Sequence, residues 1–355
     1  MRNISWVLLP IIMTGFLTSA SALEGESIVF NPKTGNYLIT YLNSSDNAFR
    51  QVTFIPATKI KPTLISKFKL EQDGANHYEY TLFSGWNSQQ VIRHLTLDKV
   101  SSVVTQLSHI PTLNARVETE MGDLINKAKI LDTPPAPWET SMNYSDGGQL
   151  YRFGLWYRHI TGGLTPGSKV TFGLRSLDLP GIIQAEIHGY APGSKKLPGD
   201  TDLDAEDGGF GQKYTEIVHK RNFVPRFATV PTIAVPTPFN AAVLLESIQT
   251  QMHTWIAMQL LDATFSSQLD RYLISAANAY RLNQPKAGKE FIQTLRKMLK
   301  KEHEDADRDD DKEDGKHEDK SDDKAKGKQI DRLAARVLDF DLKYVLKRMG
   351  GDKDD

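Results

Sequence analysis

Residues 70–83 read LEQDGANHYEYTLF, a stretch that combines a turn signal with an alternation of apolar and polar side chains. The dipeptide Asp73-Gly74 favours a tight hairpin connection between two strands. After the turn, Tyr78, Tyr80 and Leu82 share one side of an extended chain, which is the pattern of a half-buried antiparallel strand. The stretch therefore predicts a β-hairpin with one face in a protein core.

The same period of two continues on both sides of this hairpin, from residue 27 to about residue 236. Short alternating runs are separated by turn residues, including Pro166-Gly167 and Pro180-Gly181. Strands this short and regular predict one Ig-like antiparallel β-sandwich domain over residues 23–236. The runs occupy residues 37–42, 52–55, 91–97, 151–157, 170–174 and 182–188.

One segment within this region has helical periodicity instead. Across residues 112–131, apolar side chains fall on one helical face and charged side chains on the other. The prolines at positions 134, 135 and 137 cannot continue a helix or a central strand. We therefore predict one inserted helix, with an apolar stripe of Leu113, Val117, Met121, Leu124 and Ala128.

Beyond Pro238 the apolar spacing becomes three or four, which predicts a C-terminal helical bundle over residues 237–349 and an α+β fold class. Ser266 or Ser267 is the predicted N-cap of one helix, and Gln284-Pro285 ends that helix and opens the next. A final helix carries apolar residues between Ile330 and Tyr344.

An acidic stretch interrupts the predicted bundle. Residues 302–323 contain thirteen Asp or Glu against four Lys or Arg, and no apolar side chain larger than alanine. This composition predicts a disordered, solvated linker over residues 302–328. The alternative interpretation is that the stretch collects cations or contacts a basic surface.

The first 22 residues have the layout of a secretory signal peptide, with Arg2, an apolar run and the small triplet at residues 20–22. We therefore expect a secreted or periplasmic protein with no membrane span after cleavage. The chain has no cysteine, which excludes disulfides, thiolate nucleophiles and thiolate metal sites. A formal net charge of −1 without a basic stripe argues against nucleic acid as a partner.

Motifs for nucleophilic hydrolases, zinc proteases, phosphate loops and dinucleotide binding are missing from the sequence. The best metal candidate is an acidic loop whose alternate carboxylates could converge on calcium. It departs from an EF-hand loop at Ala205 and Gly211, so a solvated acidic turn is the alternative interpretation. Its carboxylates are Asp200, Asp202, Asp204, Glu206 and Asp207.

Aromatic side chains offer a candidate ligand platform on the sandwich. Trp86, Trp138 and Trp156 are the predicted contacts for a sugar or peptide. The alternative is that these aromatic residues belong to the core, because strand faces rich in aromatic residues are commonly buried. Trp156 alternates with Leu155 and Tyr157 and is the residue expected on the outer face.

Residues 77–82 carry a Y-x-Y-x-L motif and residues 88–92 an S-x-Q-x-I motif, and Pro166-Gly167-Ser168 and Leu179-Pro180-Gly181-Ile182 follow. These motifs resemble strands of certain uncharacterised exported bacterial β-sandwich proteins. Residues 287–292 and 330–346 are similar to the helical FIMAH-type module that trails extracellular proteins. The resemblance implies no catalytic residue and implies an accessory or binding role.

Export, the sandwich pattern and the missing catalytic motifs together favour a non-enzymatic exported protein. Its sandwich domain is expected to contact a polysaccharide, a peptide or a cell-envelope protein, and the bundle to mediate association. Two alternatives stay open. One is a secreted hydrolase with cross-strand carboxylates, and the other is a structural protein stabilised by calcium.

Overall fold

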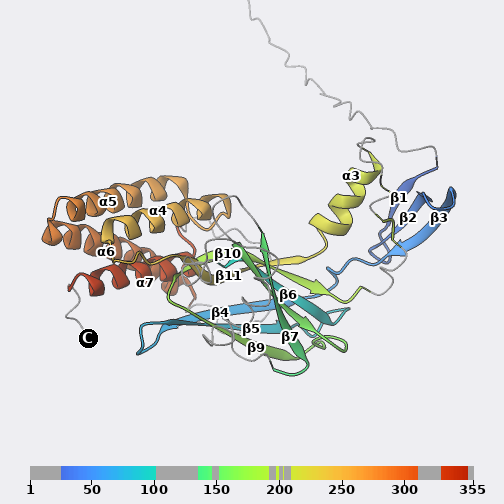
Figure 1. The fold of residues 1–355 in the computed structure, drawn as a ribbon, viewed down its shortest axis with the longest axis horizontal. Helices are drawn as coiled ribbons and strands as arrows, with labels where there is room; N and C mark the ends of the chain where they lie inside the picture. The colour runs from blue at the N-terminus through green and yellow to red at the C-terminus, as the bar shows by residue number, and fades with distance from the viewer. Residues whose placement is uncertain are drawn as a thin grey trace, which may run out of the picture. The chain divides into compact units, whose positions relative to one another are not determined.

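The computed structural model describes residues 25–100, 135–145, 152–191, 197–199, 203, 209–310 and 329–350. The fold is mixed α+β, with three antiparallel sheets and helices that are mostly C-terminal (Figure 1). The chain divides into two compact units, Met1–Thr58 with Ala191–Phe223, and Lys59–Tyr190 with Val224–Asp355. The predicted signal peptide and the predicted helix at 112–131 lie outside the described residues.

The first unit is a three-stranded meander covered by a short helix. Strands β1 (Ser27–Asn31), β2 (Asn36–Asn43) and β3 (Ala48–Phe54) pair in that order. Helix α3 (Phe210–Thr215) and the π-helical turn η3 (Glu216–Lys220) supply Phe210, Tyr214 and Val218 to a core shared with Ile28 and Ile39. Alternation thus predicts these strands, but not that they pair apart from the later ones.

The second unit contains two sheets. One has the order β4-β5-β9, formed by β4 (Pro62–Leu70), β5 (Asn76–Ser84) and β9 (Lys169–Ser176). The other has the order β11-β10-β6-β8-β7. Its strands are β6 (Ile92–Val100), β7 (Trp138–Ser145), β8 (Arg152–His159), β10 (Leu179–Gly189) and β11 (Val224–Ile233).

The hairpin predicted at Asp73-Gly74 is confirmed. Strands β4 and β5 pair antiparallel with Leu70 opposite Asn76, and Gly74 has a φ of 86°. Tyr78, Tyr80 and Leu82 are fully buried, so the alternation also predicts the inward face. Side chains from both sheets share this core, for example Tyr157, whose ring stacks on that of Phe172 with centroids 4.1 Å apart.

Four helices follow the sheets and enclose a second core. They are α4 (Ala241–Ala257), α5 (Ala263–Arg281), α6 (Pro285–Asp310) and α7 (Arg332–Arg348). Helix α6 begins at Pro285, as predicted, because proline lacks only an N–H that the first helical turn leaves unpaired. The helix extends past residue 302, where the sequence predicts the linker to begin, and ends at Asp310.

The predicted cap of α5 is wrong. Asp262, and neither Ser266 nor Ser267, is the N-cap, because its side chain accepts hydrogen bonds from the N–H groups of Thr264 and Phe265. Ser266 is instead a buried residue within the first turns of the helix. Both residue types cap helices well, and the sequence offered candidates at each position.

The helical core is continuous with the five-stranded sheet. Leu179, Ile182 and Ile233 from β10 and β11 belong to the same buried cluster as the apolar faces of α4 to α7. Helix α7 also contacts β4, where Arg336 Nη2 donates a hydrogen bond of 3.1 Å to the Ser66 carbonyl oxygen. Among the described residues, the helices are all too short or too polar to cross a membrane.

Candidate anion-binding groove

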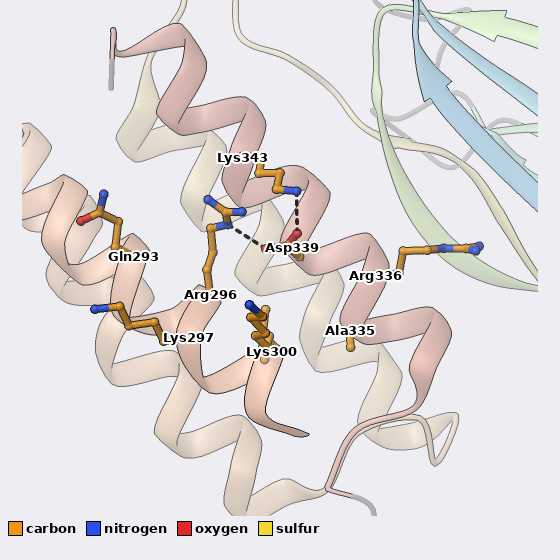
Figure 2. Close-up of a pocket in the computed structure, with 9 residues that line it drawn as sticks. Gln293, Arg296, Lys297, Lys300, Ala335, Arg336, Asp339 and Lys343 are labelled. Atoms are coloured by element: carbon orange, nitrogen blue, oxygen red, sulfur yellow. Dashed lines mark hydrogen bonds and ion pairs between the residues drawn. The ribbon is translucent and has the colours of Figure 1, made fainter. Parts of the chain in front are cut away.

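Helices α6 and α7 leave a basic groove between them. The apolar stripe of α6 buries Ile292, Leu295 and Leu299, which places Arg296, Lys297 and Lys300 beside the core instead of in it. Together with α7 they border a cavity of about 730 Å³ (Figure 2). Its lining comprises Gln293, Arg296, Lys297, Leu299, Lys300, Ala335, Arg336, Asp339 and Lys343.

A second cavity of about 390 Å³ adjoins the first and reaches β4. The two cavities share Arg336, Asp339 and Lys343, and the second adds Lys67, Phe68 and Phe340. We use "basic groove" for the two linings together. Among the described lining residues, six cationic side chains and one carboxylate, that of Asp339, surround this groove.

The single carboxylate pairs with two of the cations. Arg296 Nε donates a hydrogen bond of 2.7 Å to Asp339 Oδ1, and Lys343 Nζ lies 3.3 Å from Asp339 Oδ2. The first pair joins α6 to α7, whereas the second spans one turn of α7. Figure 2 shows the three side chains converging at the centre of the groove, with Lys297 on one side and Arg336 on the other.

Arg336 is held against β4. Its guanidinium lies over the Phe68 ring, 5.5 Å from the centroid, in addition to its hydrogen bond to Ser66. Burial, and secondarily the nearby charge of Arg332, lower the pKa of Arg336 from its ordinary value. Arginine starts so far above neutrality that Arg336 stays charged at physiological pH.

The basic groove has the chemistry of a binding site. The carboxylate of Asp339 is already paired with two of the lining cations. The excess of Lys and Arg favours a ligand with several negative charges. Phe68 and Phe340 add apolar surface at the β4 end.

Of the three predicted aromatic contacts, Trp86 and Trp138 lie in different surroundings. Trp86 is exposed to 77 % and packs on the backbone at Gly167, where a Cβ atom would overlap the indole. Trp138 is exposed to only 5 % and its ring meets that of Phe172 edge-on, so it is a core residue and is unavailable to a ligand. Trp156 pairs with Thr96 in the β6–β8 ladder, and its side chain lies outside the described part.

The predicted calcium ligands Asp200, Asp202, Asp204 and Glu206 all lie outside the described residues. Within the described ranges, no group of three or more His, Asp or Glu side chains is placed to hold a metal ion. Two histidines do lie close together: the ring centroids of His94 and His188, on the paired strands β6 and β10, are 6.2 Å apart. His188 Nε2 is also 3.6 Å from Glu186 Oε2.

The spacing of basic residues in the sequence is a signal for the basic groove, separate from the spacing of apolar residues. Arg296, Lys297 and Lys300 recur at the spacing of one helical face, as do Arg336 and Lys343. What the sequence could not indicate is that these two faces meet, because residues 311–328 separate the helices.

No protein-family model matches the chain, and no curated protein is significantly similar to it.

Proposed function

We propose that this chain is an exported, non-enzymatic accessory protein that binds an anionic polysaccharide in the basic groove. The observation that carries the proposal is the groove itself, whose described lining residues place six cations against one carboxylate around two adjoining cavities. Such an excess of charge attracts polyanions and raises their association rate. The proposal includes an Ig-like sandwich followed by a helical bundle as the architecture, with the ligand on the bundle.

A charge-reversal experiment tests the site. The mature chain should bind sulfated dextran and not uncharged dextran, with an affinity that falls steeply as salt rises. Lys297→Glu with Lys67→Glu should weaken this binding by about ten-fold or more, since two attractive charges become repulsive. Lys286→Glu with Lys347→Glu is the matched control, because both lysines are exposed on α6 and α7 outside the groove linings.

Equal losses in the two double variants would show that binding follows net charge and not the groove. No binding of sulfated dextran by the parent chain would overturn the proposal. Circular dichroism of each variant establishes that the helices are retained.

Export is a separate part of the proposal, supported by the leader in residues 1–22. Expression of the whole chain, followed by fractionation and mass spectrometry, should recover a protein that begins at Leu23 from the periplasm or the medium. Recovery of the uncleaved chain from the cytosol would contradict export and leave the groove experiment unaffected.

A further inference from the structure

Asp339 divides the basic groove into two parts. It lines both cavities and is the one carboxylate among the lining residues that the structure describes. Each of its oxygens has a different partner, because Oδ1 accepts from Arg296 and Oδ2 faces Lys343 Nζ. Arg296 and Lys343 therefore share one protein carboxylate, which offsets one of their two positive charges.

Other lining cations lie on opposite sides of this triad. Lys297 comes from α6, and Arg336 and Lys67 border the β4 end. Figure 2 shows Lys297 and Arg336 pointing away from each other, with Asp339 between them. A small anion can contact one of these sides only, whereas an extended ligand can contact both.

The Arg296–Asp339 pair is geometrically better than an ordinary surface pair. Arg296 is held by a charge-assisted hydrogen bond of 2.7 Å, and its side chain is only 26 % exposed. A ligand anion that replaced Asp339 would exchange one anionic contact of Arg296 for another and leave Asp339 without this partner. Replacement therefore gains little for a singly charged ligand.

We propose that Asp339 is a specificity-determining residue, which keeps Arg296 and Lys343 from the ligand and makes the groove select extended polyanions whose charges straddle it. The inference rests on the proposed binding function of the same groove. It assigns recognition to Lys297 on one side and to Arg336 and Lys67 on the other, and it assigns to Asp339 the rejection of single anions.

The variant Asp339→Asn tests this assignment, because it removes the charge and keeps the shape. Calorimetric titration should show no binding of inorganic sulfate to the parent and clear binding to the variant, whose Arg296 and Lys343 are released. Sulfated dextran should bind both proteins, with a steeper salt dependence in the variant by up to about two charges, since that slope follows the number of cations engaged. Asp270→Asn, which removes a paired carboxylate from α5, is the control and should change neither ligand.

A second comparison separates Arg296 from Lys297. In the parent background, Lys297→Gln should weaken sulfated dextran binding by about two- to five-fold, and Arg296→Gln by less. In the Asp339→Asn background the two losses should become equal. If Arg296→Gln costs as much as Lys297→Gln in the parent, or if Asp339→Asn gains no sulfate binding, the role of Asp339 is refuted while polyanion binding stands. If the parent does not bind sulfated dextran, the proposed function itself fails.

Discussion

Phe340 on α7 meets Phe68 on β4 edge-on, with ring centroids 4.9 Å apart and ring planes at 81°. Edge-to-face pairs of this kind add to the free energy gained from burying the rings. Both residues also line the β4 end of the basic groove. The contact therefore holds α7, which forms one side of the groove, against the β4-β5-β9 sheet.

Truncation of Phe340 should destabilise the protein. We expect Phe340→Ala to lower the free energy of unfolding by about 2 kcal/mol, less than for a fully buried ring because Phe340 is half-buried. Phe340→Leu keeps most of the apolar surface and should cost about 1 kcal/mol. Urea denaturation measures both values, and identical losses would contradict a specific contribution of the ring pair.

Asp341 predicts a dependence of stability on pH. The side chain is fully buried on α7, and within the described part neither carboxylate oxygen has a hydrogen-bond partner. Burial raises the pKa of Asp341 well above its ordinary value. A carboxyl with a raised folded pKa costs nothing below its unfolded pKa and destabilises progressively as pH rises above it.

We therefore expect Asp341→Asn to gain stability relative to the parent as pH increases from about 4 to 8, by about 2 kcal/mol at neutrality. Denaturation midpoints of both proteins across this range provide the measurement. Parallel curves for the two proteins would show that Asp341 does not titrate during unfolding.

His94 predicts the opposite behaviour in acid. Burial, His188, Arg93 and Arg158 together lower the pKa of His94 to about 4. A histidine with a depressed folded pKa contributes stability above its unfolded pKa of about 6.5, and this stability is lost as pH falls toward the folded value. NMR titration should find the imidazole of His94 neutral at pH 5. His94→Gln should reduce the loss of stability between pH 6.5 and 4 by about 2 kcal/mol.

The cap of α5 is tested by substitution at two neighbouring positions. Asp262→Ala should cost about 1 kcal/mol, because it leaves the N–H groups of Thr264 and Phe265 without their side-chain acceptor. Ser267→Ala should cost less than about 0.5 kcal/mol, since Ser267 is exposed and only bonds back to the Ala263 carbonyl oxygen. Thermal melts that rank the two variants in reverse would contradict this assignment.

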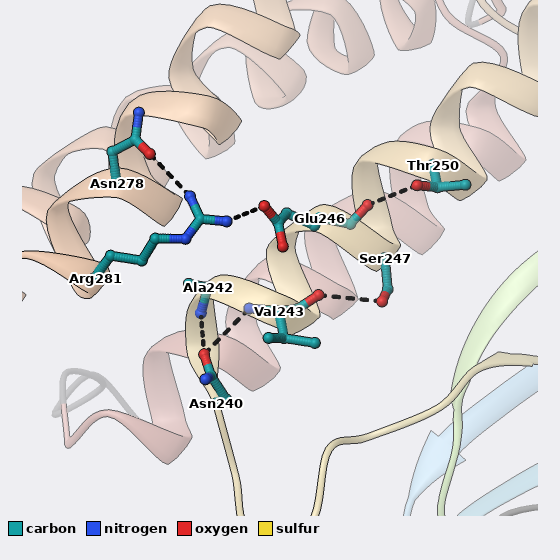
Figure 3. Close-up of polar contacts among 8 residues, drawn as sticks. All are labelled: Asn240, Ala242, Val243, Glu246, Ser247, Thr250, Asn278 and Arg281. Atoms are coloured by element: carbon teal, nitrogen blue, oxygen red, sulfur yellow. Dashed lines mark hydrogen bonds and ion pairs between the residues drawn. The ribbon is translucent and has the colours of Figure 1, made fainter.

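Helix α4 also begins with a side-chain N-cap, that of Asn240, so the same prediction applies to it. Asn240 Oδ1 accepts from the N–H groups of Ala242 and Val243, at 3.1 and 3.2 Å (Figure 3). The figure also shows Arg281 pairing with Glu246, which links the end of α5 to the first turns of α4. Asn240→Ala should therefore cost about as much as Asp262→Ala.

Gly181 on β10 should resist any side chain. A Cβ atom at this position would overlap Thr232 Oγ1 and lie 2.9 Å from Gln251 Cδ on α4. Gly181→Ala should therefore destabilise the protein by about 2 kcal/mol through overpacking. Gly162→Ala is the matched control, because a Cβ atom there has nothing within 4 Å. Equal melting temperatures for the two variants would contradict close packing between α4 and β10.

Period and turn chemistry predicted much of the second unit. The Asp73-Gly74 hairpin, the inward face of Tyr78, the start of α6 at Pro285 and the apolar stripes of the helices follow from local spacing. Trp138 was predictable by the same rule, because it begins an alternation with Thr140, Met142 and Tyr144 that marks one face of β7.

The separate β1–β3 sheet and the basic groove depend on contacts between residues far apart in the chain, which local spacing does not predict. Strand β1 pairs with β2, but an alternating strand could pair equally well with several other strands. The period alone therefore does not predict that β1 to β3 form a separate sheet. The basic groove depends on which faces of α6 and α7 meet across a long acidic stretch. Helical spacing places Arg296 and Asp339 on their own helices, but it contains no information on their distance.

In the first unit, strands β1 to β3 share a core with helix α3, which comes after β10 in the chain. During synthesis, the apolar face of Ile28, Ile39 and Phe54 therefore leaves the ribosome well before Phe210 and Tyr214 exist to cover it. At ordinary elongation rates the delay is on the order of ten seconds. Until then the apolar face of the meander lacks the side chains that cover it in the folded unit.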